Sequence, residues 1–166
     1  MNNYSADLFD ELWIKYNRKI YSYFRRQFDE HTAEDLCQQT YLKAWSHISA
    51  YSGIGIKQNK AWLFTVARNV KNDHLRYIQL HSMNFKYENL YEADKAVESN
   101  VDESLAIQKT FARLCEEERQ LLSMAEYLTS KEIGSVLGIS ASAVRNRIQK
   151  AKDHLKKLLE ESEINI

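Results

Sequence analysis

The stretch from Thr129 to Leu159 constrains the fold most, because its apolar residues repeat with a helical period on both sides of a short turn. The apolar positions before the turn are Ile133, Val136 and Leu137, and those after it are Val144, Ile148, Ala151, Leu155 and Leu158. Steps of four, three, four and three keep residues on one face of an α-helix. Gly138 suits a helix end in the left-handed conformation, Ser140 can cap the next helix, and Gly134 fits a close helix crossing. The stretch predicts a helix, a turn and a second helix.

The opposite face of the second predicted helix is polar and basic. It carries Ser142, Arg145, Asn146, Gln149 and Lys150. Such side chains can donate to guanine or pair with adenine edges, on a helix of a size that enters the major groove. The alternative is an ordinary helical bundle, in which a basic outer face is only solvated. We favour DNA binding, because turn chemistry, helix spacing and outward residue types agree.

Breakers are rare in the rest of the chain, which has no proline and only four glycines among 166 residues. With abundant Leu, Glu, Lys, Gln and Arg, this scarcity predicts an all-α protein of one domain or two small ones. The two cysteines, Cys37 and Cys115, are far apart and lack the spacing of a metal or redox site. We expect both to be reduced thiols in the core of a cytoplasmic protein.

Several function classes are disfavoured by what the sequence lacks. No apolar run approaches the roughly 20 residues of a membrane span, and the N-terminus has no signal-peptide pattern. No paired carboxylate or histidine cluster at ligand spacing supports a helical enzyme. We therefore expect no catalytic residues, no cofactor, no metal and no small-molecule substrate.

Charge is unevenly distributed in a chain whose net charge is zero. Residues 139–159 carry six basic residues and one acidic residue, a net charge of +5. Because phosphate neutralisation supplies most nonspecific affinity, a neutral chain with one basic helix should bind DNA weakly by itself. We expect help from a partner.

The N-terminal part predicts two helices. The first runs from about residue 6 to residue 28, and Asp29-Glu30-His31 breaks it. Thr32 and Asp35 resemble a capping box at the start of the second helix, which ends near residues 46–49. Its polar face carries Glu34, Asp35, Gln38, Gln39 and Lys43. From the residues alone, the default interpretation of this face is a plain solvated surface, and a functional face is the alternative.

A third helix is predicted from about Lys60 to Ile78, after a long loop over residues 49–59. Its apolar arc comprises Leu63, Val66, Ala67, Val70, His74 and Ile78. Opposite lie Thr65, Arg68, Asn72 and Arg76, with Asn69 and Asp73 at the margin. Trp62 is near the same margin, where it can be either a core residue or an exposed stacking surface.

Residues 80–103 have weak periodicity and a net charge of −4, which predicts a flexible acidic linker. Helical patterns resume near residue 104, and Glu116-Glu117-Glu118 predicts another helix start, where acidic side chains are favourable. The predicted domains are therefore residues 1–79, a linker over 80–103, and residues 104–166 with the helix-turn-helix.

Two motifs in this order carry a resemblance to a known family. AEDLCQQTYLKAW, from Ala33 to Trp45, and AWLFTVARNVKNDHLR, ending at Arg76, resemble region two of bacterial sigma factors of the extracytoplasmic-function (ECF) group. ERQLL, followed by LTSKEIGSVLGISASAVRNRIQKAKDHL, resembles their region four. The resemblance covers nearly the whole chain and implies two helical bundles in a promoter-specificity subunit of RNA polymerase.

In region two the resemblance implies two sets of contacts. Asp35, Gln38 and Gln39 match the helix that grips the coiled-coil clamp of the polymerase largest subunit, although the family usually has Glu at the position of Gln39. Trp62, Arg68, Asn69, Asp73 and Arg76 match or adjoin the segment that meets the minus-ten element. The loop over residues 49–59 corresponds to the one that captures a flipped base, on which Tyr51 can stack.

In region four the resemblance implies contacts to the minus-thirty-five element. The matching residues are Ala143, Arg145, Asn146, Arg147, Gln149 and Lys150. Arg145 and Asn146 are nearest the helix start, where side chains reach bases, whereas Arg147 and Lys150 suit phosphates. The implied partners are core RNA polymerase, promoter DNA and an anti-sigma factor that can hold the protein at the membrane. The alternative function is a stand-alone helix-turn-helix transcriptional regulator.

Overall fold

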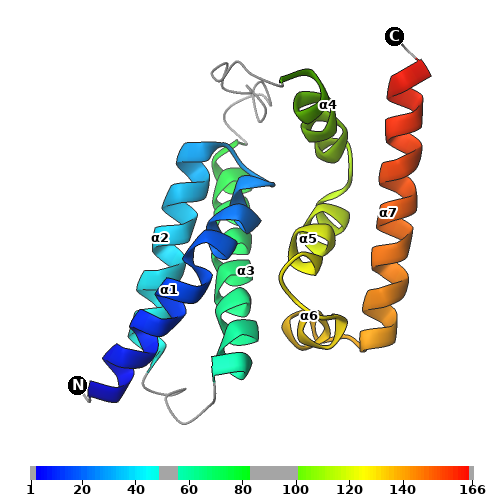
Figure 1. Cartoon of the computed structure of the whole chain (residues 1–166). Helices are drawn as coiled ribbons and strands as arrows, with labels where there is room; N and C mark the ends of the chain where they lie inside the picture. Colours follow the sequence, from blue (N-terminus) through cyan, green and yellow to red (C-terminus); the bar gives the residue numbers. More distant parts are fainter. Residues whose placement is uncertain (1–2, 49–55, 83–100, 165–166) are drawn as a thin grey trace. The chain divides into compact units, whose positions relative to one another are not determined.

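The computed structural model describes residues 3–48, 56–82 and 101–164, and every secondary-structure element within those ranges is a helix (Figure 1). The chain divides into two compact units, residues 1–94 and 95–166. This arrangement confirms an all-α fold with helical bundles. Both ends of the predicted linker over residues 80–103 are helical, because one helix extends to His81 and another begins at Val101; residues 83–100 lie outside the described residues, so flexibility there stays a prediction.

The first unit is a bundle of three helices, α1 (Asn3–Arg25), α2 (Glu30–His47) and α3 (Ile56–His81), each packed against the other two. Its core is rich in aromatic rings: Tyr23 and Phe24 of α1 are fully buried, and Tyr23 meets Phe64 of α3 edge to face at 5.8 Å. Each large ring that is buried removes much apolar area from water and so stabilises the unit. This packing fixes α2 and α3 side by side.

The start of α2 corrects one sequence-based prediction. The N-cap is Asp29, whose carboxylate accepts from the Thr32 N–H at 3.0 Å and from the Thr32 hydroxyl at 2.6 Å. The predicted capping box of Thr32 with Asp35 is wrong, because Thr32 is already in the first turn of the helix. Asp29, one of the three residues expected to end the first helix, is therefore the cap of the second.

The third helix is longer than its apolar pattern predicted. It begins at Ile56, so the predicted loop over residues 49–59 is too long; Tyr51 lies outside the described residues. It ends at His81, beyond the predicted first domain limit. Lys71 is fully buried in this helix, although its sequence position gave no apolar signal.

The second unit comprises α4 (Val101–Ala112), α5 (Glu116–Ala125), α6 (Ser130–Leu137) and α7 (Ala141–Ile164), and the first three pack along α7 (Figure 1). Thr129 and Glu132 form a capping box at the start of α6, with bonds of 2.7 and 3.2 Å. Gly138 ends α6 at a φ of 70°, as predicted for a left-handed residue. The helix-turn-helix is confirmed.

Gly134 is needed for a reason slightly different from the predicted helix crossing. A Cβ at this position would lie 2.6 Å from the carbonyl oxygen of Ile139, which belongs to the turn. The Ile139 N–H in turn donates to the Gly134 carbonyl at 3.0 Å. The turn therefore folds tightly back on α6, and only glycine leaves enough space.

The two cysteines differ. Cys37 is buried in α2, and burial raises the pKa of its thiol to about 11, in agreement with an inert core thiol. Cys115 is exposed, so the prediction of a core thiol is wrong for this residue. It occupies the N-cap position of α5, and its N–H donates to Glu118 at 3.0 Å. A position that opens a helix keeps its side chain outside the apolar stripe.

Candidate nucleic-acid and partner interfaces

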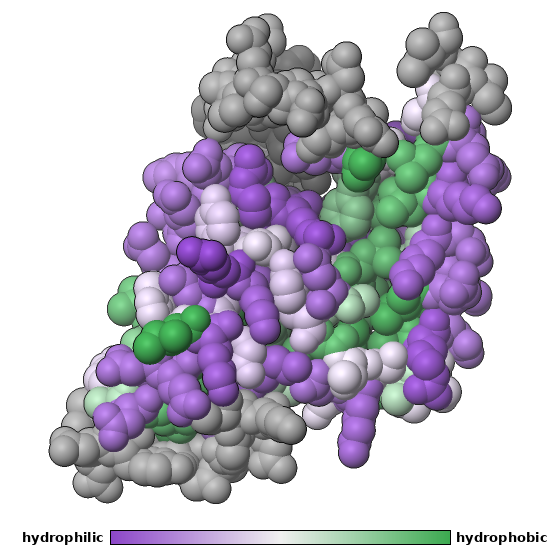
Figure 2. All heavy atoms as spheres, in the orientation of Figure 1, coloured by the Kyte–Doolittle hydropathy of each residue, from purple (hydrophilic) through white to green (hydrophobic). Residues whose placement is uncertain are grey.

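The helix α7 is amphipathic along its length. Val144, Ala151 and Leu158 are buried against the other helices of the unit, as the helical period predicted. Figure 2 shows hydrophilic residues on the side of α7 that faces away from α4, α5 and α6. The Ser140 hydroxyl accepts from the Ala143 N–H at 3.2 Å and so caps the helix start.

The residues predicted to read DNA on α7 form one exposed surface, which we call the α7 face. Its exposed members are Arg145, Asn146, Gln149 and Lys150. Ala143 is half-buried beside them, one turn before Arg147. A helix that presents guanidinium, amide and ammonium groups together can contact both base edges and phosphates.

Arg147 differs from its neighbours, because its guanidinium makes a short ion pair with Glu117 of α5. A second bond joins the same helices: His154 Nδ1 lies 2.9 Å from the Glu118 carboxylate. Partial burial alone would raise the pKa of Glu118, but its hydrogen bonds with His154 and Cys115 outweigh burial and lower it. Arg147 therefore has a protein partner on α5, in addition to any role toward phosphates.

The residues predicted to meet the minus-ten element lie along α3. Asn69, Asp73 and Arg76 are exposed, whereas Trp62 and Arg68 are half-buried. The Nε atom of Arg68 is buried and has no hydrogen-bond partner among the described residues. The structure thus brings Asn69, Asp73 and Arg76 together on one exposed surface. Trp62 is half-buried, which is intermediate between the core residue and the exposed stacking surface that the sequence allowed.

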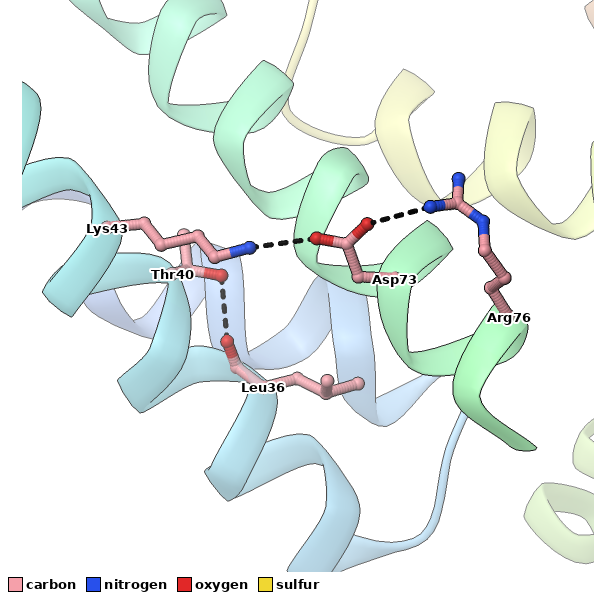
Figure 3. A network of polar contacts seen from close by, with 5 residues as sticks. All are labelled: Leu36, Thr40, Lys43, Asp73 and Arg76. Atoms are coloured by element: carbon pink, nitrogen blue, oxygen red, sulfur yellow. Dashed lines mark hydrogen bonds and ion pairs between the residues drawn. The ribbon is translucent and has the colours of Figure 1, made fainter. Parts of the chain in front are cut away.

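Asp73 is the centre of a network that joins α3 to α2 (Figure 3). Its carboxylate accepts from Lys43 Nζ at 2.8 Å and from Arg76 Nη1 at 3.5 Å. The hydrogen bond from Lys43 is the main cause that lowers the pKa of Asp73; burial acts in the opposite direction, and the charges of Lys43 and Arg76 lower the pKa further. Lys43 was not among the predicted site residues, because 30 positions separate it from Asp73.

The residues predicted to bind polymerase, Asp35, Gln38 and Gln39, are all exposed on α2. Asp35 has His31 one turn earlier on the same helix, with 3.9 Å between His31 Nε2 and Asp35 Oδ2. Both are open to water, so this pair restrains Asp35 only weakly. Asp35, Gln38 and Gln39 form a polar strip that is available to a partner.

Beside this polar strip lies an apolar feature that sequence reasoning missed. A groove of about 480 Å³ runs between α1 and α2. Its lining residues are Ala6, Phe9, Asp10, Trp13, Gln38, Tyr41, Leu42 and Trp45. We call it the α1/α2 groove. The rings within it contact one another edge to face, with 4.6 Å between the centroids of Trp13 and Tyr41 and 4.9 Å between those of Phe9 and Trp45.

The groove leaves large apolar side chains in water. Leu42 is 70% exposed, Trp13 40% and Trp45 37%. A signal for it was present in the sequence, because Phe9 and Trp13 are one helical turn apart, as are Tyr41 and Trp45. Tyr41 belongs to the buried stripe of α2, and only the packing of α1 on α2 brings the two pairs together.

The described residues contain no group of three or more His, Cys, Asp or Glu side chains arranged to hold a metal ion. Among the same residues, no helix is both long enough and apolar enough to cross a membrane.

Comparison with known families explains both units together. The model of sigma-70 region 2 matches residues 7–79, and that of sigma-70 region 4 matches residues 104–155. The chain is a member of the sigma-70 family, in its ECF group. The first match covers the unit with the α1/α2 groove, and the second covers the helix-turn-helix.

Three curated sigma factors are similar to this chain along most of its length. This sigma factor is 28% identical over 156 residues to RNA polymerase sigma factor SigZ of Bacillus subtilis, covering 91% of this chain and 86% of SigZ. It is 26% identical over 171 aligned residues to sigma factor YlaC of the same organism, covering 94% of each protein. ECF sigma factor BldN of Streptomyces coelicolor is 29% identical over 93% of this chain and 61% of its own length.

Two solved structures share the fold of this sigma factor. CnrH, in complex with the cytosolic domain of CnrY, has a TM-score of 0.69 at 21% identity, covering 95% of this chain and 96% of CnrH. RpoE from Bartonella quintana, in complex with the anti-sigma factor NepR, has a TM-score of 0.70 at 22% identity, covering 93% of this chain and 97% of RpoE.

Proposed function

We propose that this sigma factor directs core RNA polymerase to promoters by three contacts, each made by a different surface. The observation that carries the proposal is the α7 face, on which Arg145, Asn146, Gln149 and Lys150 are exposed together while Val144 and Ala151 anchor the helix. Arg145 and Asn146 read base edges of the minus-thirty-five element in the major groove. Lys150 contacts phosphates.

The α1/α2 groove and the polar strip beside it form the polymerase contact. Trp13, Leu42 and Trp45 supply apolar area that is exposed in the free chain, and Asp35 and Gln38 supply polar contacts at its edge. Aromatic anchors surrounded by polar groups are typical of strong protein interfaces. The occupant is the coiled-coil clamp of the polymerase largest subunit, which lays a helix along the groove.

The exposed side of α3 meets the minus-ten element. Asn69 offers an amide that can pair with an adenine edge, and Arg76 offers a guanidinium. Trp62, half-buried at the start of the helix, supports a base by stacking. Because each DNA contact is weak alone, binding of both units to polymerase raises their effective concentration at the promoter.

The protein supplies recognition and no catalytic step, so its action depends on polymerase and takes place in the cytoplasm. A third partner is an anti-sigma factor, as in the structure of similar fold that contains the anti-sigma factor NepR. Such a partner inhibits by covering surfaces that polymerase needs, and the exposed α1/α2 groove is one of them.

Run-off transcription tests the function. Core polymerase, with and without the purified chain, is given a library of promoter fragments, and we expect transcripts from a subset only when the chain is present. A stand-alone regulator would instead shift promoter DNA in a band-shift assay without polymerase, at physiological salt. That result, with no polymerase-dependent transcript, would contradict the proposal.

A further inference from the structure

We propose that Asp73 is a positioning residue, which holds Lys43 of α2 and Arg76 of α3 as a pair of cations for the DNA backbone. Lys43 thereby joins the promoter-binding surface. This inference rests on the proposed contact of α3 with the minus-ten element, and it changes the role of Asp73 from a direct DNA contact to a support.

The geometry of the network gives the first argument. The two cations approach different oxygens of one carboxylate, Lys43 at Oδ2 and Arg76 at Oδ1 (Figure 3). All three side chains remain open to solvent, since Lys43 is 48%, Asp73 53% and Arg76 69% exposed. Both oxygens of the Asp73 carboxylate therefore have a cationic partner, whereas Lys43 and Arg76 have further N–H donors that are open to solvent.

The charges give the second argument. An isolated carboxylate on a DNA-binding surface repels phosphates, but this one is matched by two cations, so the cluster carries a net charge of +1. Lys and Arg side chains are long, and holding them in place before binding reduces the conformational entropy lost when a phosphate is bound. Asp73 thus offsets its own repulsion by keeping both cations in position.

The place of Lys43 gives the third argument. It lies one helical turn after Gln39, so the helix proposed to hold polymerase also supplies a cation to the surface proposed to hold DNA. Exposed ion pairs of this kind contribute little to folding stability. Unlike the His31–Asp35 pair at 3.9 Å, the Lys43–Asp73 contact is a direct hydrogen bond at 2.8 Å, and it joins the two functional helices, so we assign it to positioning.

The test uses the full chain bound to core polymerase and measures affinity for fragments with every base at each minus-ten position, across a range of salt. Lys43→Gln is expected to weaken binding by roughly tenfold on all sequences and to reduce the salt slope by about 1. Lys43→Arg keeps the charge and should restore most of the affinity. An unchanged affinity and salt slope for Lys43→Gln would overturn the proposal.

Asp73→Asn separates positioning from the alternatives by the sign of its effect. If Asp73 positions the cations, affinity falls evenly over all base sequences, and adding Lys43→Gln to Asp73→Asn costs less than it does in the unaltered chain. If Asp73 only repels phosphates, affinity rises. If it contacts a base, preference changes at one promoter position. Either of the last two results would overturn the inference.

Lys15→Gln is the matched control, because Lys15 also pairs with a carboxylate in this unit, that of Glu11 at 3.5 Å, and is 53% exposed. It should change neither affinity nor salt slope. Thermal unfolding monitored for each variant distinguishes loss of folding from loss of positioning. Failure of the proposed function would appear differently, as absence of promoter-dependent transcription by the unaltered chain.

Discussion

The outer faces of α2 and α7 are both polar, but they differ in what surrounds the polar groups. Beside Asp35 and Gln38 on α2 lie Leu42 and Trp45, two large apolar side chains that remain in contact with water. Among the described residues, α7 contributes no large exposed apolar side chain, and its outer face is basic.

The difference distinguishes a surface suited to protein from one suited to DNA. A protein partner can cover apolar area, and removing this area from water drives association. The DNA backbone is instead negatively charged and binds cationic side chains. In the proposed function, the Asp35–Trp45 side of α2 contacts the polymerase and the outer face of α7 contacts the promoter. Substitutions on one surface should leave the other function intact, and this separation can be tested.

Asp35→Arg should have the largest effect, because it places a cation where the proposed interface needs a carboxylate. Mismatched charge in an interface costs several kcal/mol, so co-purification with core polymerase should be lost. The fold should be unaffected, since Asp35 is exposed. Pull-down with immobilised core polymerase measures the effect. Normal association would refute the assignment of α2 to the polymerase.

Gly134→Ala should have the next largest effect, and only on the second unit. The new Cβ meets the Ile139 carbonyl, and such overpacking against backbone costs about 2 kcal/mol. Gly138→Ala is the matched variant: its Cβ meets nothing, but the φ of 70° costs about 1 kcal/mol. Hydrogen exchange of α6 and α7 amides should accelerate in that order, with α1–α3 unchanged. Equal exchange in both units would contradict their independence.

Arg145→Ala should cost roughly 1 to 3 kcal/mol of promoter recognition if Arg145 reads a base. Its association with core polymerase should equal that of the unaltered chain, the opposite pattern to Asp35→Arg. Competition among minus-thirty-five variants measures the loss position by position. An equal loss on every upstream sequence would make Arg145 a phosphate contact.

The smallest effects compare the helix caps of the two units. Asp29→Ala and Thr129→Ala each remove a cap and should cost about 1 kcal/mol. Partial burial would raise the pKa of Asp29, but bonds from Thr32 outweigh burial and lower it. The stability from ionised Asp29 is therefore present above its unfolded pKa and is lost as pH falls through its folded pKa. Chemical denaturation should show that the cost of Asp29→Ala is smaller at acidic than at neutral pH. The cost of Thr129→Ala, which removes a hydroxyl that does not titrate, should be the same at both.

The second unit was largely predictable from its sequence, because its features are local. The spacing of Val144 and Ala151 defined the buried side of α7, and the cap at Ser140 and the left-handed Gly138 lie within a few residues of the helix ends they control. The family resemblance then supplied the functions of the exposed residues, which periodicity alone does not give.

The first unit was harder to predict, because its important contacts join residues far apart in the chain. The α1/α2 groove exists only once Trp13 lies against Tyr41, and the network needs Lys43 beside Asp73. Cap choice at Asp29 failed for a different reason: Thr32 followed by Asp35 matches a capping box equally well by pattern. Local rules cannot rank alternatives that tertiary packing decides.

All three tryptophans of the chain, Trp13, Trp45 and Trp62, belong to the first unit. Fluorescence excited at the red edge of the indole absorption band therefore comes from that unit alone. The second unit contributes only tyrosine fluorescence. Because Trp13 and Trp45 line the α1/α2 groove, a bound helix would remove water from two of the three emitters and shift their spectrum to the blue. The protein thus carries an intrinsic optical reporter of partner binding that does not respond to unfolding confined to the helix-turn-helix.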